Sequence, residues 1–352
     1  DRSRGLGDVY KRQPMLSSIE VSKAIKHAKT AFSSWSKEPA TKRANVMHNY
    51  RGLLKQNFNE IARLISTENG KTIAEARGDI QRGFEVVEYA CGIAELQKGE
   101  SLPQVAENID GLTVREPLGV CAGISPFNFP AMVPMWMFPI AIACGNTFVL
   151  KPSEKVPLTA VKLVELLQQA GLPDGVMNLV HGGKEVVDTL CTHPDISAVS
   201  FVGSSTIAKY VYNLGSANGK RVQAGGAAKN ALVVMPDADP DSTLRAVMSA
   251  AFGCAGQRCM AGSLLVGVGE IADSLKERII KSMDNLKVGP PLLDPNTNMG
   301  PVIDKSSKER IVSIIDSVSK EAILSRDGRD LVGNEGFFVG PTLFSNCLLY
   351  TS

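Results

Sequence analysis

The stretch that decides the fold is residues 147–182, TFVLKPSEKVPLTAVKLVELLQQAGLPDGVMNLVHG. It begins with a short apolar strand and continues as a helix whose apolar residues recur every three or four positions. It ends in a second short apolar strand. A strand, a helix and a strand of these lengths form a βαβ unit, in which the two strands run parallel. The stretch therefore predicts a parallel sheet.

The same alternation continues toward the C-terminus. Further helices and strands are expected, in turn, at 184–193, 196–204, 206–215 and 221–226. Another strand–helix series begins at Asn230 with NALVVMPDAD, so a second α/β domain is expected to start there. In sheets of this type, ligands bind at the carboxyl ends of the strands.

Helical patterns are expected earlier in the chain, at 19–35, 41–70 and 74–97, and are followed by strand character over 112–125 that Pro117 interrupts. The apolar stretch 129–144 contains three prolines and is shorter than the roughly 20 residues that span a membrane. We expect it to be a buried helix and its approach. Near the N-terminus no continuous apolar core of a signal peptide is found.

Composition narrows the function. The chain has 38 basic and 36 acidic residues without a block of Lys or Arg, which favours small-molecule partners over nucleic acid. Its seven cysteines are spread out and form no CxxC pair, and its four histidines lack ligand spacing. Neither a disulfide framework nor a metal site is expected. The cysteines indicate a reducing compartment, with cytoplasm and mitochondrial matrix both open.

Two cysteines occur in AAFGCAGQRCM, residues 250–260. Glycines around Cys259 allow close approach of a substrate, and the positive charge of Arg258 favours a thiolate. The alternative is that both thiols are buried hydrophobes, as most free cysteines are. From these residues alone both interpretations stay open for Cys259, whereas Cys254 is expected to pack as a small core residue.

Three other motifs could bind ligands. In PFNFP, Asn128 lies between two prolines. Its amide could be a fixed donor to an oxyanion, or the residue could simply form a turn. In LKPSE, Lys151 and Glu154 could bind ribose hydroxyls or be solvated loop charges. In FVGS, Ser204 could help to bind a phosphate at a helix N-terminus or act only as an N-cap.

These four motifs, in this order and at these separations, resemble the aldehyde dehydrogenase superfamily. The longer stretches 123–157 and 250–261 resemble its CoA-acylating methylmalonate/malonate semialdehyde dehydrogenases. The resemblance covers about residues 14–346. It implies a Rossmann-type parallel-sheet cofactor domain and a second α/β catalytic domain.

The resemblance implies roles for individual residues. Cys259 would attack an aldehyde, with the oxyanion held by the Asn128 side chain and the Cys259 backbone N–H, and oxidation by NAD would leave a thioester. Arg258 and Arg82 would bind the carboxylate of the substrate, although Arg82 could equally be a surface arginine. The implied NAD-binding residues are Ser125, Phe127, Lys151, Ser153, Glu154, Lys155, Gly203 and Ser204. A carboxylate at Glu154 favours NAD over NADP, an inference that Lys155 beside it weakens.

One position concerns the acyl acceptor. Where hydrolytic relatives carry a glutamate as general base, this sequence has Gly225 in GGAAK. Water, with a pKa of about 15.7, needs such a base, whereas a thiol with a pKa of about 8.5 is already partly ionised. The missing carboxylate therefore favours CoA as co-substrate, with slow turnover as the other possible consequence, and the resemblance implies decarboxylation to propionyl-CoA or acetyl-CoA. The alternatives are a hydrolytic enzyme of the succinate semialdehyde type and, more distantly, a cysteine hydrolase.

The family continues beyond residue 346 with a cofactor-contacting motif and an oligomerisation strand. We therefore expect residues 1–13 and 347–352 to be flanks foreign to the family, and the sequence to be a fragment. The expected domains are an NAD-binding domain at 14–229 and a partial catalytic domain at 230–346. A full-length protein would be a homotetramer, and an inactive nucleotide-binding remnant is a further alternative for this chain.

Overall fold

The computed structural model describes residues 13–318, 322–333 and 335–346. They divide into two compact units. The sheet unit contains residues 13–61 and 77–226, and the cysteine unit contains the described residues of 62–76 and 227–346. The second unit thus begins close to the expected boundary at 230, but residues 62–76 belong to it as well. Apart from Gln13, the expected flanks lie outside the described residues.

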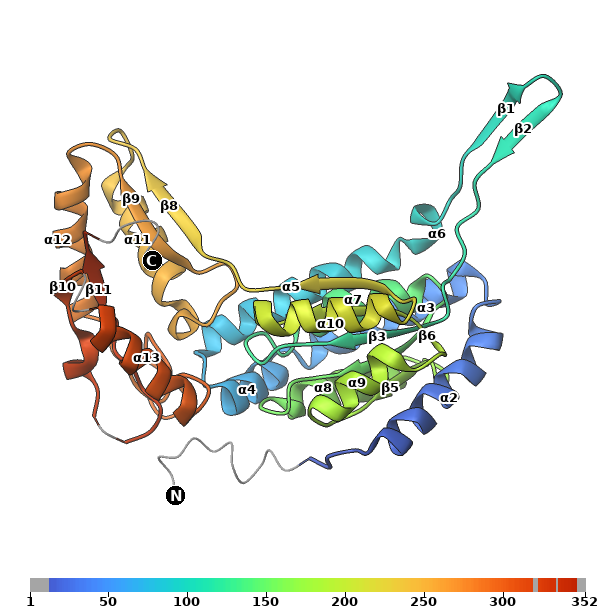
Figure 1. The fold of residues 1–352 in the computed structure, drawn as a ribbon, viewed down its shortest axis with the longest axis horizontal. Helices are drawn as coiled ribbons and strands as arrows, with labels where there is room; N and C mark the ends of the chain where they lie inside the picture. Colours follow the sequence, from blue (N-terminus) through green and yellow to red (C-terminus); the bar gives the residue numbers. More distant parts are fainter. Residues whose placement is uncertain (1–12, 319–321, 334, 347–352) are drawn as a thin grey trace. The chain divides into compact units, whose positions relative to one another are not determined.

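A five-stranded parallel sheet is the centre of the sheet unit (Figure 1). Its strands are β3 (Val120–Ile124), β4 (Thr147–Lys151), β5 (Met177–Leu179), β6 (Ile196–Val202) and β7 (Arg221–Gly225). Their order in space is β5-β4-β3-β6-β7. The chain moves outward from β3 to β5, returns to the other side of β3 at β6, and then moves outward again. The topological switch point of this Rossmann-type sheet therefore lies between β3 and β6, and the expected parallel sheet is confirmed.

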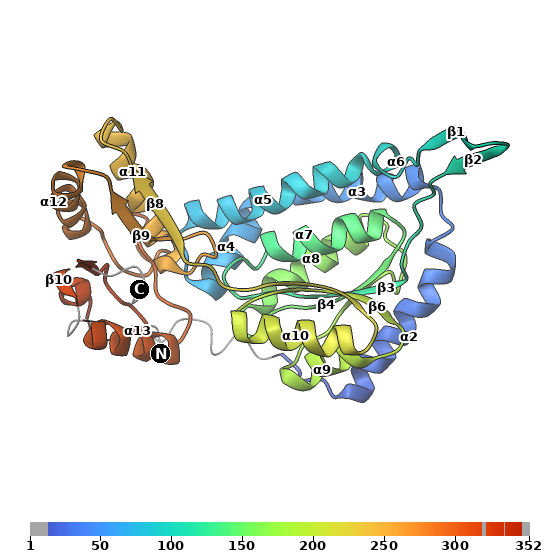
Figure 2. The ribbon, with the colours of Figure 1, turned by 45° about the horizontal axis from the view of Figure 1, so that its top comes forward.

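Helices cover both faces of the sheet (Figure 2). On one face lie α2 (Ser18–Trp35), α9 (Lys184–Thr192) and α10 (Ser205–Ala217). Their apolar side chains pack against alternate residues of the strands, such as Val120 and Ala122 of β3. On the other face lie α7 (Met132–Ala143) and α8 (Pro157–Gln169), with α3 (Ala40–Gln56) packed against both. Because both faces are covered, all residues of β3 and β4 are buried.

Helix α7 confirms the expectation for the apolar stretch 129–144. Eight of its twelve residues are buried, and the Phe138 ring packs edge-on against Phe148 of β4, with centroids 6.5 Å apart. A Trp35 side chain from α2 donates a hydrogen bond of 2.9 Å to the Ile142 carbonyl. Among the helices that the structure describes, none is long and apolar enough to cross a membrane.

A β-hairpin projects from the sheet unit, after α5 (Ile73–Cys91) and α6 (Ile93–Leu96) (Figures 1 and 2). Its antiparallel strands are β1 (Ser101–Ala106) and β2 (Ile109–Leu112). Nearly all of its residues are exposed, including Leu102, Val105 and Ile109. A lone two-stranded ribbon is marginally stable in water, so its apolar side chains need a further partner.

The cysteine unit contains a parallel pair of strands, β8 (Asn230–Val234) and β9 (Gly262–Gly267), as expected for a second α/β series. Its small cores are formed around α11 (Pro240–Phe252), α12 (Ile271–Asp284) and α13 (Lys305–Val318). Helix α4 (Phe58–Asn69) and α5 each cross the division between the units. The remaining described elements are η1 (Gly253–Gly256), β10 (Ile323–Arg326), η2 (Gly328–Leu331) and β11 (Leu343–Ser345).

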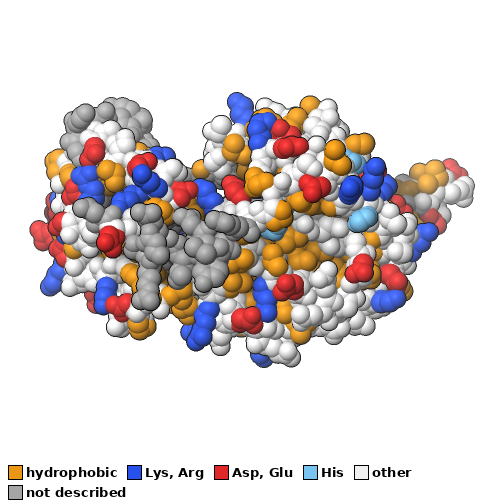
Figure 3. Space-filling model, turned by 90° about the horizontal axis from the view of Figure 1, so that it is seen from below, with side chains coloured by type: hydrophobic (Ala, Val, Ile, Leu, Met, Phe, Trp, Pro, Cys, Tyr) orange, Lys and Arg blue, Asp and Glu red, His pale blue; other side chains and the backbone are white. Residues whose placement is uncertain are grey.

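The described surface carries charges of both signs. On the face shown in Figure 3, Lys and Arg side chains alternate with Asp and Glu side chains rather than forming one extended basic region. This pattern agrees with the small formal net charge of +2.

Candidate active site

In the sheet unit, the expected cofactor residues follow three neighbouring strands. Ser125 and Phe127 follow β3, residues 151–155 end β4 and continue beyond it, and residues 203–204 follow β6. The ends of β3 and β4 are joined by a 3.1 Å hydrogen bond from the Ser125 N–H to the Lys151 carbonyl. Because β4, β3 and β6 are adjacent and parallel, these residues share one edge of the sheet at the switch point.

Ser125 supplies a direct test of ligand fit. Its residue is 4 % exposed, and its Oγ has no hydrogen-bond partner among the residues that the structure describes. A buried hydroxyl without a partner costs free energy, so such groups usually meet a ligand or a water. A hydroxyl of this kind at the carboxyl edge of the sheet fits a polar cofactor bound there.

Lys151 and Glu154 form an ion pair at the end of β4. The Lys151 side chain is buried, and its Nζ lies 3.1 Å from Glu154 Oε2 and 3.0 Å from the Pro152 carbonyl. Burial by itself would raise the pKa of Glu154, but Lys151 and further hydrogen bonds hold that pKa below its usual value. Glu154 is therefore a carboxylate at neutral pH, as an acceptor for ribose hydroxyls must be.

The neighbours of Glu154 are also held in place. The Ser153 Oγ accepts a 3.3 Å hydrogen bond from the Lys155 N–H, and Ser153 itself is buried. The Lys155 Nζ lies 5.4 Å from the centroid of the Phe127 ring, which is a cation–π contact. Phe127 and Lys155, which the sequence analysis assigned to the same site, thus lie together.

Ser204 precedes α10 at its N-cap position. Its side chain makes no capping hydrogen bond, and Ser204 and the first residues of the helix are exposed. Ser204 thus occupies the N-cap position without a capping side-chain hydrogen bond and is exposed beside the N–H groups of the first turn, and its role in binding phosphate stays a prediction. Such a helix start attracts phosphate because of its free donors and the helix dipole.

Exchanging Ser204 for aspartate tests this phosphate site. Aspartate and asparagine cap helices equally well, so Ser204→Asp and Ser204→Asn should unfold at similar temperatures. The charge of Ser204→Asp should raise the KM for NAD by about three-fold, since a charge at an exposed helix N-terminus contributes roughly 0.3–1 kcal/mol. Steady-state kinetics of both variants check this. An equal KM for the two would place the pyrophosphate elsewhere.

Asn128 lies between β3 and α7, and a buried carboxylate fixes the start of that helix. Asp79 Oδ1, from α5, accepts a 2.7 Å hydrogen bond from the Met132 N–H, the first residue of α7. Arg82 lies one turn further along α5, is 68 % exposed at its side chain, and forms an ion pair of 3.0 Å with Glu85. This exposed pair fits a surface arginine and leaves the substrate-binding role of Arg82 a prediction.

In the cysteine unit, a left-handed turn precedes Cys259. After α11, Cys254 and Ala255 have φ values of 52° and 53°, and Gly256 has φ 73°. A left-handed conformation costs a non-glycine residue roughly 1–2 kcal/mol. Such strain is found where surrounding contacts enforce it, often at functional sites. The loop that presents Cys259 is therefore held by its neighbours.

Two amide side chains supply part of this support. The Gln257 amide donates to the Cys254 carbonyl at 3.1 Å and accepts from the Ile303 N–H at 2.9 Å. The Asn230 Nδ2, at the start of β8, donates to the Cys259 carbonyl at 2.9 Å. Cys259 is half-buried, with its backbone fixed by Asn230. Sequence analysis missed Asn230, because nothing in a strand's first residue reveals a partner 29 positions away.

Arg258 is also engaged within its own unit. Its guanidinium lies 3.4 Å from Glu75 Oε1, and donates to the Ser249 carbonyl at 3.2 Å and to the Cys254 Sγ at 3.3 Å. Burial raises the pKa of Cys254, so this thiol is protonated at neutral pH. The packing role expected for Cys254 agrees with its burial, and Arg258 has contacts that the sequence did not predict.

Cys259 and Arg258 belong to the cysteine unit, whereas Asn128, Arg82 and the expected cofactor residues belong to the sheet unit. The pairing of Asn128 with Cys259 and the joint use of the two arginines stay predictions.

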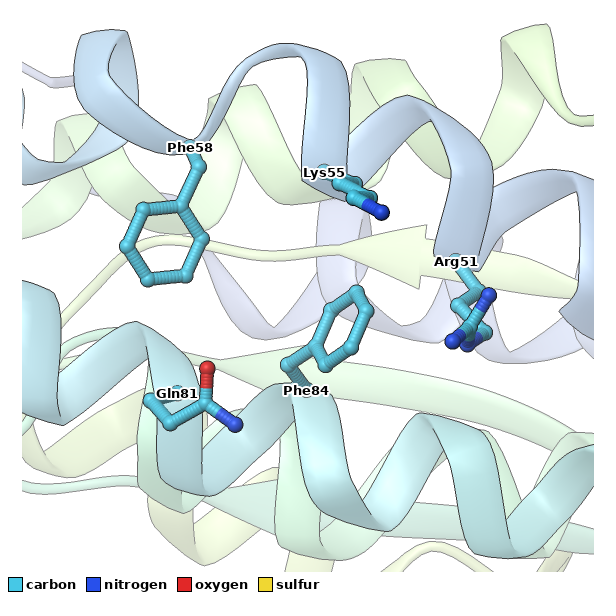
Figure 4. Close-up of a pocket in the computed structure, with 5 residues that line it drawn as sticks. All are labelled: Arg51, Lys55, Phe58, Gln81 and Phe84. Atoms are coloured by element: carbon cyan, nitrogen blue, oxygen red, sulfur yellow. The ribbon is translucent and has the colours of Figure 1, made fainter.

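A shallow pocket of about 150 Å³ lies on the helices of the sheet unit, lined by Arg51, Lys55, Phe58, Gln81 and Phe84. Figure 4 shows the Phe58 and Phe84 rings extending toward one another from α4 and α5. The Arg51 guanidinium stacks on Phe84 at 5.3 Å and pairs with Glu88. This pocket contains none of the expected site residues.

Known proteins are similar to this chain in both sequence and fold. Malonate-semialdehyde dehydrogenase of Halalkalibacterium halodurans is 49 % identical over 342 residues, which cover 97 % of this chain and 70 % of that protein. The crystal structure of methylmalonate-semialdehyde dehydrogenase from Oceanimonas doudoroffii has a TM-score of 0.91 and 50 % identity, covering 94 % of this chain and 68 % of its own. A Sinorhizobium meliloti protein, crystallised with NAD and named for the methylmalonate-semialdehyde enzyme, has a TM-score of 0.91 and 47 % identity, with the same coverage.

A family model places these similarities in one group. The model of the aldehyde dehydrogenase family matches residues 3–349, which is nearly the whole chain. The match includes the switch-point edge of the sheet and the loop of Cys259. This chain belongs to the aldehyde dehydrogenase family.

Proposed function

We propose that this protein is an NAD-dependent, CoA-acylating dehydrogenase of malonate or methylmalonate semialdehyde. The observation that carries the proposal is the loop that presents Cys259 beside Arg258. It contains left-handed residues and is held by hydrogen bonds from Asn230 and to Glu75. The relatives named for these two substrates, at about half identity over most of the chain, support the substrate class.

In this proposal Cys259 is the nucleophile. Its thiolate attacks the aldehyde carbon, and the oxyanion is held by the Asn128 amide and the Cys259 N–H. The hydrogen bond from Asn230 to the Cys259 carbonyl fixes the peptide backbone at the nucleophile. An oxyanion donor on a backbone that is already fixed, such as the Cys259 N–H, needs no reorganisation when charge develops.

NAD would be held by the edge of the sheet unit. The Ser125 hydroxyl, the Glu154 carboxylate and the start of α10 would bind it, and NAD supplies the oxidant for the thiohemiacetal when bound. The S. meliloti relative crystallised with NAD supports this choice of cofactor. The carboxylate of Glu154 would repel a 2′-phosphate, which favours NAD over NADP.

CoA is the proposed acyl acceptor because of Gly225. This residue ends β7, and the atoms nearest to an added Cβ would be 3.7 Å away, so a side chain would fit there. Glycine at this position therefore does not result from lack of space. Without a carboxylate to activate water, a partly ionised thiol is the better acceptor of the acyl group. Decarboxylation would then yield acetyl-CoA or propionyl-CoA.

The CoA dependence of turnover tests this proposal. With malonate semialdehyde and NAD, adding CoA should raise steady-state NADH formation by at least about ten-fold, since general-base help typically contributes 10²–10⁴-fold to hydrolysis. NADH absorbance and detection of acetyl-CoA measure the result. A rate indifferent to CoA would favour a hydrolytic enzyme of the succinate semialdehyde type. Cofactor binding without any turnover would favour an inactive nucleotide-binding remnant.

We also propose that the protein assembles as a homotetramer. The exposed apolar side chains of the β1–β2 hairpin, such as Leu112 at 76 % exposure, need a partner surface. Another copy of the chain would provide it by symmetric assembly. Sedimentation analysis of the wild type and of Leu112→Asp would show whether the hairpin mediates this contact.

A further inference from the structure

The guanidinium of Arg258 occupies a fitted position in the cysteine unit. Besides its contacts with Glu75, the Ser249 carbonyl and the Cys254 thiol, it packs directly on the backbone of Gly253. A Cβ added to Gly253 would lie 2.4 Å from Arg258 Cζ. Gly253 therefore leaves the space that this side chain fills, and any larger residue would displace the guanidinium.

Glu75 is the anionic group in this arrangement. Its Oε2 accepts hydrogen bonds of 2.9 Å from the N–H and the Oγ1 of Thr72, which cap the start of α5. Its Oε1 accepts a 2.6 Å hydrogen bond from the Cys254 N–H, in addition to the Arg258 contact. The carboxylate is thus fixed to a helix end on one side and to the left-handed turn on the other.

These contacts leave Arg258 able to bind an anion. The charge of Glu75 is shared among four donors, and the contact with Arg258, at 3.4 Å, is the longest of them. A guanidinium has five N–H groups, and three of them donate to Glu75, Ser249 and Cys254 within the described part of the chain. Two N–H groups are left for a carboxylate, which an arginine binds in a bidentate way.

We propose that Glu75 is a positioning residue for substrate specificity, which orients Arg258 toward the substrate's carboxylate and fixes the turn before Cys259. A side chain that is already immobilised loses less entropy when it binds. This inference rests on the proposed function. It adds a residue 184 positions before Cys259 to the determinants of the substrate class.

Two variants displace Arg258 by different routes. Glu75→Gln keeps the side-chain shape and one acceptor oxygen but removes the charge, and Gly253→Ala occupies the space of the guanidinium. Each should raise the KM for malonate semialdehyde about ten-fold while the KM for propanal, a neutral aldehyde, changes by less than about two-fold. In an Arg258→Leu background, Glu75→Gln should change neither value further. The control Glu88→Gln removes an exposed Arg–Glu pair of the same helix α5 and should leave both KM values unchanged.

Alkylation of Cys259 gives a readout that needs no turnover. The thiolate displaces iodide from iodoacetate, which carries a carboxylate, or from neutral iodoacetamide, and peptide mass spectrometry isolates the rate at Cys259. The ratio of the iodoacetate rate to the iodoacetamide rate should fall about ten-fold in Glu75→Gln and in Gly253→Ala, as in Arg258→Leu.

The outcomes separate the two proposals. If the wild type oxidised propanal with the same kcat/KM as malonate semialdehyde, the proposed function would be contradicted. The role of Glu75 would be overturned by a different pattern. In that pattern the wild type prefers the semialdehyde, but the variants lose activity toward both aldehydes equally and keep the wild-type alkylation ratio. A lower KM for the semialdehyde in Glu75→Gln would also overturn it, because Glu75 would then compete with the substrate for Arg258.

Discussion

Replacement of Cys259 by alanine is expected to lower kcat/KM by about 10,000-fold or more, because loss of a covalent nucleophile removes the reaction path itself. The fold should remain, since Asn230 holds the backbone carbonyl of residue 259 and not its thiol. NADH formation from malonate semialdehyde, measured beside the thermal unfolding midpoint, checks both statements.

Cys91→Ala is the matched control. Cys91 is another half-buried thiol, on α5, and its Sγ donates only to the Val87 carbonyl one turn earlier. Its removal should change kcat/KM by less than about two-fold, as for a surface change away from a site. If Cys259→Ala kept a tenth or more of the activity while folded, another group would have to be the nucleophile.

Replacement of Arg258 by leucine is expected to raise the KM for malonate semialdehyde by about 10- to 150-fold. This range corresponds to the roughly 1.5–3 kcal/mol of a hydrogen bond between charged groups. The KM for propanal should change much less, because propanal has no carboxylate. The ratio of the two KM values is the diagnostic quantity. Contacts of Arg258 with Cys254 and Ser249 also support the loop, so kcat can fall for both aldehydes.

Arg258→Lys and Arg82→Leu complete this test. Lysine keeps the positive charge without the planar fork, so its KM for the semialdehyde should lie between those of the wild type and Arg258→Leu. A further rise of KM in Arg82→Leu would place the second arginine at the substrate. An unchanged KM would leave Arg82 as the surface residue that its ion pair with Glu85 suggests. Equal KM changes for both aldehydes in Arg258→Leu would contradict a carboxylate-binding role.

The sheet could be predicted because its signal is local. Strands β3 and β4 are buried on both faces and therefore appear as short apolar runs between amphipathic helices. The β1–β2 hairpin gave no such signal. Its side chains are exposed throughout, so no alternation of apolar and polar residues marks its strands, and Pro103 lies in one of them. Asn108 at its turn is left-handed, with φ 59°, a conformation that asparagine adopts more readily than most residues.

The site was predictable only in part. Glycine next to a helix start at Gly203 and Ser204, and a cysteine among glycines at Cys259, are short motifs with a local physical meaning. The capping box of Thr72 and Glu75 is also visible in the sequence, but it indicates only the start of a helix. The Glu75 carboxylate also accepts a hydrogen bond from the Cys254 N–H, and that contact joins residues 179 positions apart in the sequence.

The sequence by itself determined the parallel sheet, the position of Cys259 as the proposed nucleophile and the absence of a carboxylate at Gly225, because periodicity and residue chemistry are carried by neighbouring positions. Only the tertiary structure decided that Ser204 leaves its helix uncapped, that Ser125 keeps a buried hydroxyl without a partner among the described residues, and that Glu75 and Gly253 hold Arg258. Hydrogen bonds and steric contacts depend on distances of a few ångströms between segments far apart in the chain, and the order of residues does not specify those distances.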